Sequence, residues 1–501
     1  MSSNANLFAH FKRHFPSDHE TELLATADGR SVSYREADEA SARIANCLIA
    51  LGAKSGDRVT VQVEKSVENL FLYLACLRAG LVYHPLNTAY KASELEYFLG
   101  NAEPTIVVCD ADSLATIESA LSATEAGPGV NALLTLNVDG NGTLTEKAET
   151  NNADFEAAEV LGSDMAALLY SSGTTGRPKG IVPPPPPSED ITAPNALVGL
   201  ATMGVGMPTD GSLVYLSPAP LYHAAPLGWC STIHRLGGTV VIMEKFTPES
   251  ALAAIEKYRV TDSQWVPTHF VRMLKLPEEE RTRYDLSSHK RAIHAAAPCP
   301  VPIKQAMIEW WGPIIQEYYS GSEMIGMSLV KSEDWLAKPG TVGRMVHGKV
   351  HVCAPDGTEL PAGETGLLFF ENETLPSYHK DPEKTAEVMH ERGWMTLGDI
   401  GHVDEDGFIF LTDRKSHMII SGGINIYPQE IENLLIAHPD VLDAAVIGAP
   451  DPDLGERVVA VIQPVDMPQA GDALEQTLRD YLEPQLSRIK MPRQFDFRPD
   501  L

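Results

Sequence analysis

Segment 170–180 constrains the fold most, because it places four Ser/Thr hydroxyls, three glycines and two cations within eleven residues. The apolar run 165–169 before it reads as the end of a buried strand. Glycines let the backbone approach a ligand closely, and exposed N–H groups, hydroxyls and a lysine then hold an anion. A polar surface turn would explain the glycines, but not Arg177 and Lys179 beside so many hydroxyls. The pattern predicts a strand that ends in a phosphate-binding loop, although it matches neither the Walker motif nor GxGxxG.

Helix and strand patterns alternate through the first third of the chain. Segments 33–50 and 67–78 have the spacing of amphipathic helices, and 59–63 and 105–109 read as buried strands. This alternation is typical of an α/β fold with largely parallel sheets. The polar, glycine-rich and acidic segment 124–152 is predicted to be a surface excursion.

A second, smaller unit is predicted at the C-terminal end. The polar break 413–417 is followed by a glycine-rich turn, a helix that begins near Pro428, the strand 444–448 and a helix over 474–486. We therefore expect a large α/β domain with mostly parallel sheets flanked by helices over 1–413, and a small α+β domain over 414–501.

Composition narrows the classes of function. The 501 residues exceed what one hydrophobic core holds, and no apolar run is long enough to span a bilayer. With 68 acidic against 39 basic residues the net charge is −29, which argues against non-specific binding to nucleic acid or anionic lipid. The six cysteines form no CxxC pair and the N-terminus has no signal-peptide core, so a cytoplasmic location is expected.

Five consecutive prolines, 183–187, follow the predicted phosphate loop. Such a run cannot form a helix and is expected to be a stiff polyproline stretch. An SH3-type ligand is the alternative, but a rigid connector explains the run equally well.

Two further motifs each end in a carboxylate. Segment 318–323 reads Tyr-Tyr-Ser-Gly-Ser-Glu, and 393–399 reads Gly-Trp-Met-Thr-Leu-Gly-Asp. The Glu323 carboxylate is a suitable hard ligand for Mg²⁺. A carboxylate such as Asp399 suits a vicinal diol, and Arg414, further along, suits phosphate. Taken singly, each motif is also compatible with an ordinary turn.

Three weaker patterns complete the set. Segment 217–224 reads Ser-Pro-Ala-Pro-Leu-Tyr-His-Ala, 295–298 is the small-residue turn Ala-Ala-Ala-Pro, and 418–432 contains Ser-Gly-Gly ahead of the helix. Small side chains would let a flat base approach the backbone. A lone histidine such as His223 is more often structural than catalytic.

Together the six motifs resemble the acyl-adenylate-forming superfamily of acyl-CoA synthetases, peptide-synthetase adenylation domains and beetle luciferases. The resemblance spans 170–432 and extends through 33–110 and 439–492. It implies an AMP-forming acyl-CoA synthetase, in which a carboxylate attacks the α-phosphate of MgATP and coenzyme A then displaces AMP. Positioning and charge neutralisation dominate such chemistry. The implied co-substrates and cofactor are ATP, coenzyme A and Mg²⁺, and the small mobile domain is expected to rotate between the two steps.

The resemblance also implies roles for individual residues. The implied catalytic residues are Thr174, Lys179, His223 and Glu323, of which Thr174 and Glu323 also serve the metal. The coenzyme A loop is Ser421, Gly422 and Gly423, and the hinge residue is Ser416. The nucleotide is assigned to Ser171, Ser172, Gly173, Thr174, Thr175, Gly176, Lys179, Ala296, Ala297, Pro298, Tyr319, Ser320, Gly321, Ser322, Glu323, Asp399 and Arg414.

The chain departs from the family pattern in two places. The final Pro-Arg-x-x-x-Gly-Lys segment, whose lysine bridges carboxylate and α-phosphate, is absent before Leu501, and Lys490 lies too early to replace it. We therefore expect poor adenylation but conversion of supplied acyl-AMP to thioester, which pyrophosphate release with and without a restored tail would test. Ser416 also occupies the hinge position where the family commonly has a charged residue. Serine can serve as a pivot, but it has no charge with which to stabilise either conformation of the hinge.

The sequence defines the acid substrate less well. Residues 61–99 resemble malonyl-CoA synthetases, whereas 216–323, which form the acyl pocket in the family, resemble fatty-acyl and aryl-acyl CoA ligases. The expected pocket walls are His223, Trp229, Trp265 and Thr268. An apolar pocket favours medium-chain or coumarate-like acids. Malonate would need a cation for its second carboxylate, and the candidates are Arg235, Lys245 and Arg291.

Three rival classes share these motifs. A peptide-synthetase adenylation domain would load a carrier protein, but no carrier domain is expected within these 501 residues and no amino-acid-binding aspartate is evident. A luciferase-like monooxygenase would consume oxygen with acyl-AMP. A non-catalytic nucleotide-binding relative is the third class, against which the intact loop, Glu323 and Asp399 argue. The oligomeric state is open, with a homodimer as one option.

Overall fold

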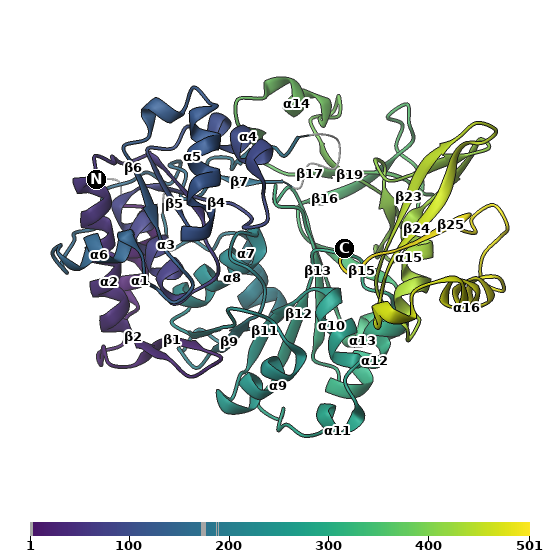
Figure 1. The fold of residues 1–501 in the computed structure, drawn as a ribbon, viewed down its shortest axis with the longest axis horizontal. Coiled ribbons are helices and arrows are strands. Elements are labelled where there is room, and N and C mark those ends of the chain that lie inside the picture. The colour runs from purple at the N-terminus through teal and green to yellow at the C-terminus, as the bar shows by residue number, and fades with distance from the viewer. Residues whose placement is uncertain (1–3, 172–176, 187, 189) are drawn as a thin grey trace.

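The structure is a computed structural model that describes residues 4–171, 177–186, 188 and 190–501. Across these described ranges the strands form sheets of thirteen, five, four and three strands. Figure 1 shows the C-terminal elements, in yellow, gathered on one side of the molecule and the N-terminal elements, in purple and blue, on the other. This large α/β part with a smaller C-terminal part confirms the fold class expected from the sequence. The boundary between residues 413 and 414 stays a prediction.

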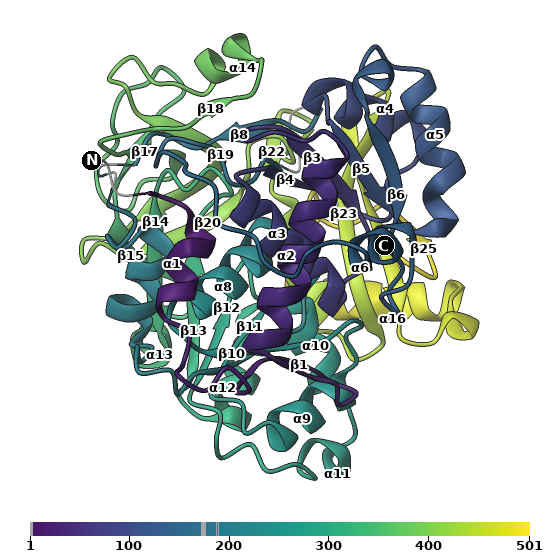
Figure 2. The same ribbon diagram turned by 90° about the vertical axis from the view of Figure 1, so that its left-hand side faces the viewer.

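The N-terminal part contains a parallel sheet in the order β4-β3-β5-β6. Its strands are β3 (Arg58–Gln62), β4 (Val82–Pro85), β5 (Ile106–Cys109) and β6 (Ala132–Thr135). The predicted helices are confirmed as α2 (Tyr34–Ala50) and α3 (Val67–Ala79). Ser33 and Ser66 cap them, because each hydroxyl accepts a backbone N–H of the first turn. Figure 2 shows α1 (Leu7–Arg13) and α2 on the face nearest the viewer.

The largest sheet changes strand direction at β13 (Ile315–Tyr319), which pairs parallel with β12 (Arg291–His294) and antiparallel with β14 (Met327–Lys331). Its remaining strands are β1 (Glu22–Thr26), β2 (Ser31–Ser33), β9 (Val214–Ser217), β10 (Thr239–Ile242), β11 (Asp262–Trp265), β15 (Thr341–His347), β16 (Lys349–Cys353), β17 (Gly366–Glu371), β19 (Met395–Val403) and β20 (Ile409–Arg414). The C-terminal end of β13 therefore lies where the parallel and antiparallel halves of the sheet meet.

A small antiparallel sheet joins distant parts of the chain. It consists of β7 (Leu169–Tyr170), β8 (Gly180–Val182) and β18 (Ser377–Tyr378), in the order β18-β8-β7. Strands β7 and β8 flank the predicted phosphate loop, so this hairpin fixes both ends of the loop.

The C-terminal sheet has the order β22-β21-β24-β23, and β25 pairs with β24. Its strands are β21 (Ile419–Ser421), β22 (Ile424–Ile426), β23 (Val441–Asp451), β24 (Gly455–Pro464) and β25 (Gln494–Phe497). Helices α15 (Pro428–Ala437) and α16 (Asp472–Leu482) bury Ile431, Leu435 and Leu478 against it. The predicted helix start at Pro428 is confirmed. Lys275 donates a hydrogen bond to the carbonyl of Val441, which ties this part to the large one.

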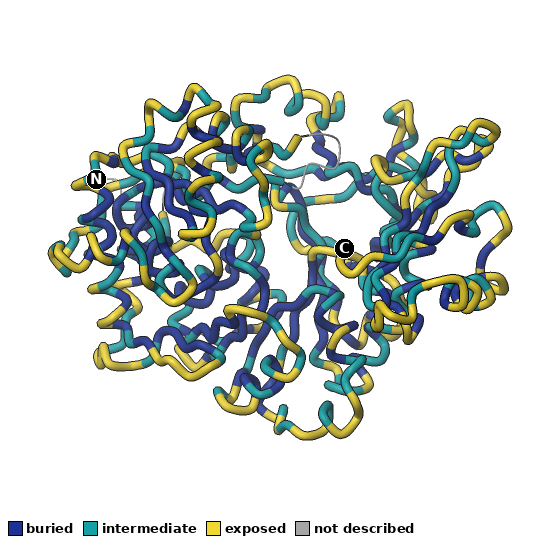
Figure 3. The backbone as a smooth tube through the Cα atoms, viewed as in Figure 1, coloured by how far each residue is buried: buried dark blue, intermediate teal, exposed yellow. Residues whose placement is uncertain are grey.

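The other helices surround the sheets. They are α4 (Ala92–Ala102), α5 (Leu114–Ser122), α6 (Thr143–Glu149), α7 (Ala196–Gly199), α8 (Ala224–Arg235), α9 (Pro248–Lys257), α10 (Pro267–Leu274), α11 (Glu278–Arg281), α12 (Val301–Trp311), α13 (Ser332–Ala337) and α14 (Pro382–Glu387), with a π-helical stretch over Leu200–Val205. Figure 3 shows that the buried residues follow the strands and the exposed ones the loops and outer helices.

Two local predictions are wrong. Segment 124–152 is not a surface excursion, because it contains β6, which pairs with β5, and α6, which buries Leu144 and Ala148. Its few apolar residues suffice for an edge strand and for a helix with only one buried face. The run 165–169 is not a buried strand either; β7 begins only at Leu169, and Leu168 is the buried member of the run. Residues 183–186 have no regular secondary structure, and the polyproline conformation stays a prediction.

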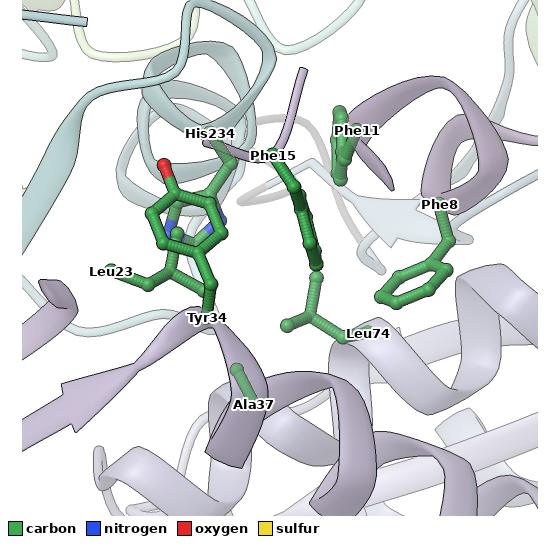
Figure 4. Close-up of a pocket in the computed structure, with 8 residues that line it drawn as sticks. All are labelled: Phe8, Phe11, Phe15, Leu23, Tyr34, Ala37, Leu74 and His234. Atoms are coloured by element: carbon green, nitrogen blue, oxygen red, sulfur yellow. The ribbon is translucent and has the colours of Figure 1, made fainter. Parts of the chain in front are cut away.

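A small apolar cavity lies under the N-terminal helix, far along the chain from the predicted motifs. Figure 4 shows Phe8, Phe11 and Phe15 lining it from one side and Tyr34 and Leu74 from the other. Its volume is about 10 Å³, which is at most one water molecule. It is a packing defect in the core and has no room for a substrate.

Candidate active site

Asp399 is held between two other predicted site residues. Strands β19 and β20 pair Asp399 with Arg414, whose Nε lies 3.3 Å from Asp399 Oδ1. Tyr319, at the end of β13, donates its hydroxyl to Asp399 Oδ2 at 2.5 Å. Burial, reinforced by the Asp399 charge, raises the pKa of Tyr319 well above its usual value, so the phenol keeps its proton. The arrangement fixes a buried carboxylate in one orientation before any ligand arrives.

Tyr378, which the sequence motifs did not include, contacts both Glu323 and Lys179. Tyr378 donates its hydroxyl to Glu323 Oε1 at 3.1 Å, and Lys179 Nζ lies 4.9 Å from the centroid of the Tyr378 ring. Tyr378 is only 5% exposed. None of the six motifs contains Tyr378, because the pairing of β18 with β8 brings it to the site from a distant part of the chain.

The described ends of the predicted phosphate loop lie side by side. Ser171 N donates to Lys179 O at 2.9 Å, and Lys179 N donates to Ser171 Oγ at 3.3 Å. The Arg177 guanidinium lies 5.3 Å from the Tyr97 ring centroid. The predicted residues Ser172, Gly173, Thr174, Thr175 and Gly176 lie outside the described residues.

The loop after β13 packs tightly around Glu323. Ser320 Oγ donates to the carbonyl of Gly326 at 2.8 Å, which closes the loop, and Ser322 is exposed. Met324 has a φ of 54°, a left-handed conformation that costs energy for a residue with a side chain. Strain of this kind marks functional loops, and here it adjoins the predicted metal ligand.

Replacing Gly321 with alanine should weaken MgATP binding about tenfold, as overpacking costs about 1–3 kcal/mol. A Cβ atom at this position would lie 2.6 Å from Leu397 Cδ2 and 2.9 Å from Glu323 Oε2, so the carboxylate would have to move. Isothermal titration calorimetry measures the effect. Gly129→Ala is the matched control, because a Cβ there meets no atom within 4 Å. Equal affinities of the two variants would show that packing at Gly321 does not place Glu323.

The predicted adenine turn is open and strained. Ala296, Ala297 and Pro298 are exposed, and Ala296 has a φ of 79°. They follow β12, the parallel neighbour of β13, so the turn and Tyr319 lie at the ends of adjacent strands. An exposed turn of small side chains leaves room for a flat ring to approach the backbone.

The structure does not support two of the predicted acyl-pocket walls. Trp229 and Trp265 are both fully buried, and their indole N–H groups are used internally, by Tyr318 Oη at 3.3 Å and Ser263 Oγ at 2.6 Å. Both belong to the core, because large apolar side chains on a helix and strand face the layer beneath them. His223, the cap residue of α8, is exposed, and Thr268 in α10 is half-buried.

Two of the three cations considered for a second substrate carboxylate are engaged elsewhere. Arg235 donates to the carbonyls of Ile191 and Ala193. Arg291 Nη2 donates to Asp262 Oδ2 at 3.0 Å within the sheet. Lys245 is exposed after β10.

The predicted hinge and coenzyme A loop form two turns beside the C-terminal sheet. Ser416 is exposed in the turn between β20 and β21. Gly422 and Gly423, with φ values of 57° and 79°, make the exposed β21–β22 turn, a conformation that glycine adopts without strain. Ser421 is buried, and its hydroxyl donates to Glu456 O at 2.6 Å. This serine thus supports the turn from within the sheet.

Two family models match the chain over these elements. One described as AMP-binding enzyme matches residues 11–376, and one described as AMP-binding enzyme C-terminal domain matches 430–501. The chain belongs to the AMP-binding enzyme family. Its relatives are acyl-CoA synthetases and ligases, so the predicted class, an acid–thiol ligase that acts through an acyl-adenylate, is confirmed.

Relatives of this family align over nearly the whole chain. Feruloyl-CoA synthase from Amycolatopsis sp is 32% identical over 475 residues, which cover 94% of this chain and 90% of the relative. The long-chain fatty-acid CoA ligase FadD13 from Mycobacterium tuberculosis is 31% identical over 471 residues, covering 93% and 89%. The structure of ATP-bound MatB from Rhodopseudomonas palustris superimposes with a TM-score of 0.83 at 35% identity, covering 100% and 96%. Within the described residues, no helix is long and apolar enough to cross a membrane.

Proposed function

We propose that this ligase joins an apolar or aromatic carboxylic acid, of the medium-chain or coumarate type, to coenzyme A. The observation that carries the substrate class is the engagement of Arg235 by backbone carbonyls and of Arg291 by Asp262. Asp262 neutralises Arg291, backbone carbonyls hold Arg235 in place, and the third candidate, Lys245, is exposed. A buried second carboxylate without a cation costs several kcal/mol. The relatives named for ferulate and long-chain fatty acids support the same class. Malonate is the second candidate, favoured by the resemblance of residues 61–99 to malonyl-CoA synthetases.

In this proposal the nucleotide lies across the C-terminal ends of β12 and β13 and the middle of β19. Asp399, oriented by Tyr319, receives the ribose hydroxyls, and Arg414 beside it faces the phosphates. The exposed turn at Ala296 takes the adenine. Lys179 and the loop hydroxyls hold the β- and γ-phosphates. These residues bind ATP and orient its phosphates, and positioning of this kind is the main contribution of the protein to the reaction.

Glu323 fits the requirements of Mg²⁺. Among the described residues, no group of three or more His, Cys, Asp or Glu side chains could hold a metal by itself. Mg²⁺ is usually bound by one or two carboxylates together with substrate phosphates, so a single oriented glutamate beside a phosphate loop is suitable. When bound there, the ion would neutralise charge on the phosphates.

Coenzyme A would approach along the β21–β22 turn after the C-terminal part rotates about the turn at Ser416. The exposed Gly422 and Gly423 leave space for the pantetheine arm. We also propose a cytoplasmic location and the division at residues 413 and 414; a homodimer is one possible assembly.

An acid panel tests the proposed substrate. With the C-terminal tail restored, AMP release from ATP and coenzyme A should be at least about tenfold faster with octanoate or coumarate than with malonate, because the second charge of malonate would be buried unpaired. Benzoate, whose carboxylate is attached directly to the ring, tests whether the shorter aromatic acid is also a substrate. Faster turnover of malonate would reverse the assignment.

A second arm starts from synthetic octanoyl-AMP and coenzyme A, and measures thioester formation alone. Because this arm supplies free coenzyme A and no carrier protein, thioester formation in it excludes a carrier-loading enzyme. An oxygen electrode in the same reaction distinguishes a monooxygenase. Thioester formation here without AMP release from octanoate, coumarate or benzoate would place the defect in adenylation.

A further inference from the structure

Tyr378 contacts both charged side chains of the phosphate end of the proposed site. Its hydroxyl donates to Glu323 Oε1 at 3.1 Å, and its ring faces the Lys179 ammonium, which lies 4.9 Å from the ring centroid. The two contacts use different parts of one buried side chain. The hydroxyl acts on the carboxylate and the π-face on the cation.

The sheet β18-β8-β7 dictates this position. Tyr378 pairs with Ile181 across the antiparallel strands, and Lys179 lies two residues before Ile181, so it projects to the same face as a diagonal neighbour. His379 N donates to Gly180 O at 2.7 Å, which extends the pairing to the end of the phosphate loop. The strand that closes the loop therefore also delivers the tyrosine.

Glu323 is then restrained on both sides. The phenol occupies Oε1, and Oε2 faces the closely packed Gly321, where an added Cβ would lie 2.9 Å from it.

We propose that Tyr378 is a positioning residue for the proposed ligase reaction: its hydroxyl orients Glu323 towards Mg²⁺, and its ring holds Lys179 towards the phosphates. This inference rests on the proposed nucleotide site and adds to it a residue outside the six motifs. Tyr378 itself touches neither the acid nor the reacting phosphorus in this arrangement.

Calorimetric titration of ATP with and without Mg²⁺ tests the proposal. Tyr378→Phe should bind ATP about tenfold more weakly than the wild-type protein in excess Mg²⁺, and equally well in EDTA, because only the carboxylate contact is lost. Tyr378→Leu, which also removes the ring, should lose affinity in EDTA as well. Tyr258→Phe is the control, since it deletes a hydroxyl that donates to the distant Thr26 carbonyl at 2.7 Å.

Three outcomes would overturn the proposal. Tyr378→Phe could match the wild-type protein in Mg²⁺, or it could lose the same affinity in EDTA, which would indicate a structural role alone. A wild-type protein that gains no ATP affinity from Mg²⁺ would refute the metal role of Glu323 and this proposal together. A failure of the proposed acid class would appear only in the acid panel, and thermal melting of both Tyr378 variants shows whether they are folded.

Discussion

Replacing Glu323 with glutamine should lower AMP release from acid, ATP and coenzyme A about 100-fold. Glutamine has the same shape and still accepts the hydrogen bond that Tyr378 donates at 3.1 Å, so the loss isolates the negative charge. A bound metal contributes several kcal/mol to the stabilisation of developing charge, and each 1.36 kcal/mol is about tenfold in rate. The measurement is steady-state AMP release at saturating ATP with the best acid of the panel.

The second half-reaction provides the contrast. Thioester formation from supplied acyl-AMP should change less than about twofold in Glu323→Gln, because pyrophosphate and its metal have left before that step. Glu373→Gln, which changes an exposed carboxylate elsewhere in the chain, should leave both reactions unchanged. Equal losses in the two half-reactions would refute a metal role and indicate that Glu323 supports the whole site.

Local signals predicted the helices of the N-terminal part well. The serine caps of α2 and α3 and the left-handed Gly80, with a φ of 68°, are encoded within a few residues, and their boundaries were predicted within one residue. Strand β6 and helix α6 were missed, since an edge strand and a one-sided helix need few apolar residues. Such elements are specified by their neighbours rather than by their own sequence.

The candidate site shows the same division. Tyr319, Asp399 and Arg414 were predicted from motifs, and the structure brings them into contact. Tyr378 carries no local signal, because its role depends on a strand pairing between segments far apart in the sequence. Trp229 was assigned to the pocket on its size and apolarity, which a core residue shares. Periodicity shows that a residue is buried, but not whether a ligand or the protein covers it.

A buried ion pair beneath the site was also invisible in the sequence, where a lysine in a helix normally indicates a solvent-exposed face. Lys304 of α12 is fully buried, with Nζ 2.6 Å from Glu317 Oε2 and 4.9 Å from the Trp335 ring centroid. Glu317 lies on β13, two residues before Tyr319, and burial raises the pKa of its carboxyl group. The pair thus underlies the strand that carries Tyr319, the residue that donates its hydroxyl to Asp399.

Replacing Lys304 with methionine should lower the free energy of unfolding by about 3 kcal/mol, because breaking a buried pair leaves one charge without compensation. The neighbouring His294 does not take over, since burial, the main cause of its lowered pKa, persists when Lys304 is replaced. Urea unfolding at 25 °C, followed by tryptophan fluorescence, measures the change. The weaker support of β13 should also reduce ATP affinity.

The double variant Lys304→Met/Glu317→Leu separates the pair from the space it fills. Two apolar side chains of similar volume leave no unpaired charge, so this variant should recover most of the stability lost in Lys304→Met. Lys384, whose side chain is 36% exposed and pairs with Glu387 at 2.6 Å, is the control, and Lys384→Met should not shift the unfolding midpoint. If the double variant is no more stable than Lys304→Met, the stability lost in Lys304→Met does not come from leaving Glu317 unpaired. The loss would then come from the missing ion pair itself. The core under the nucleotide would then depend on a charge interaction that hydrophobic packing cannot replace.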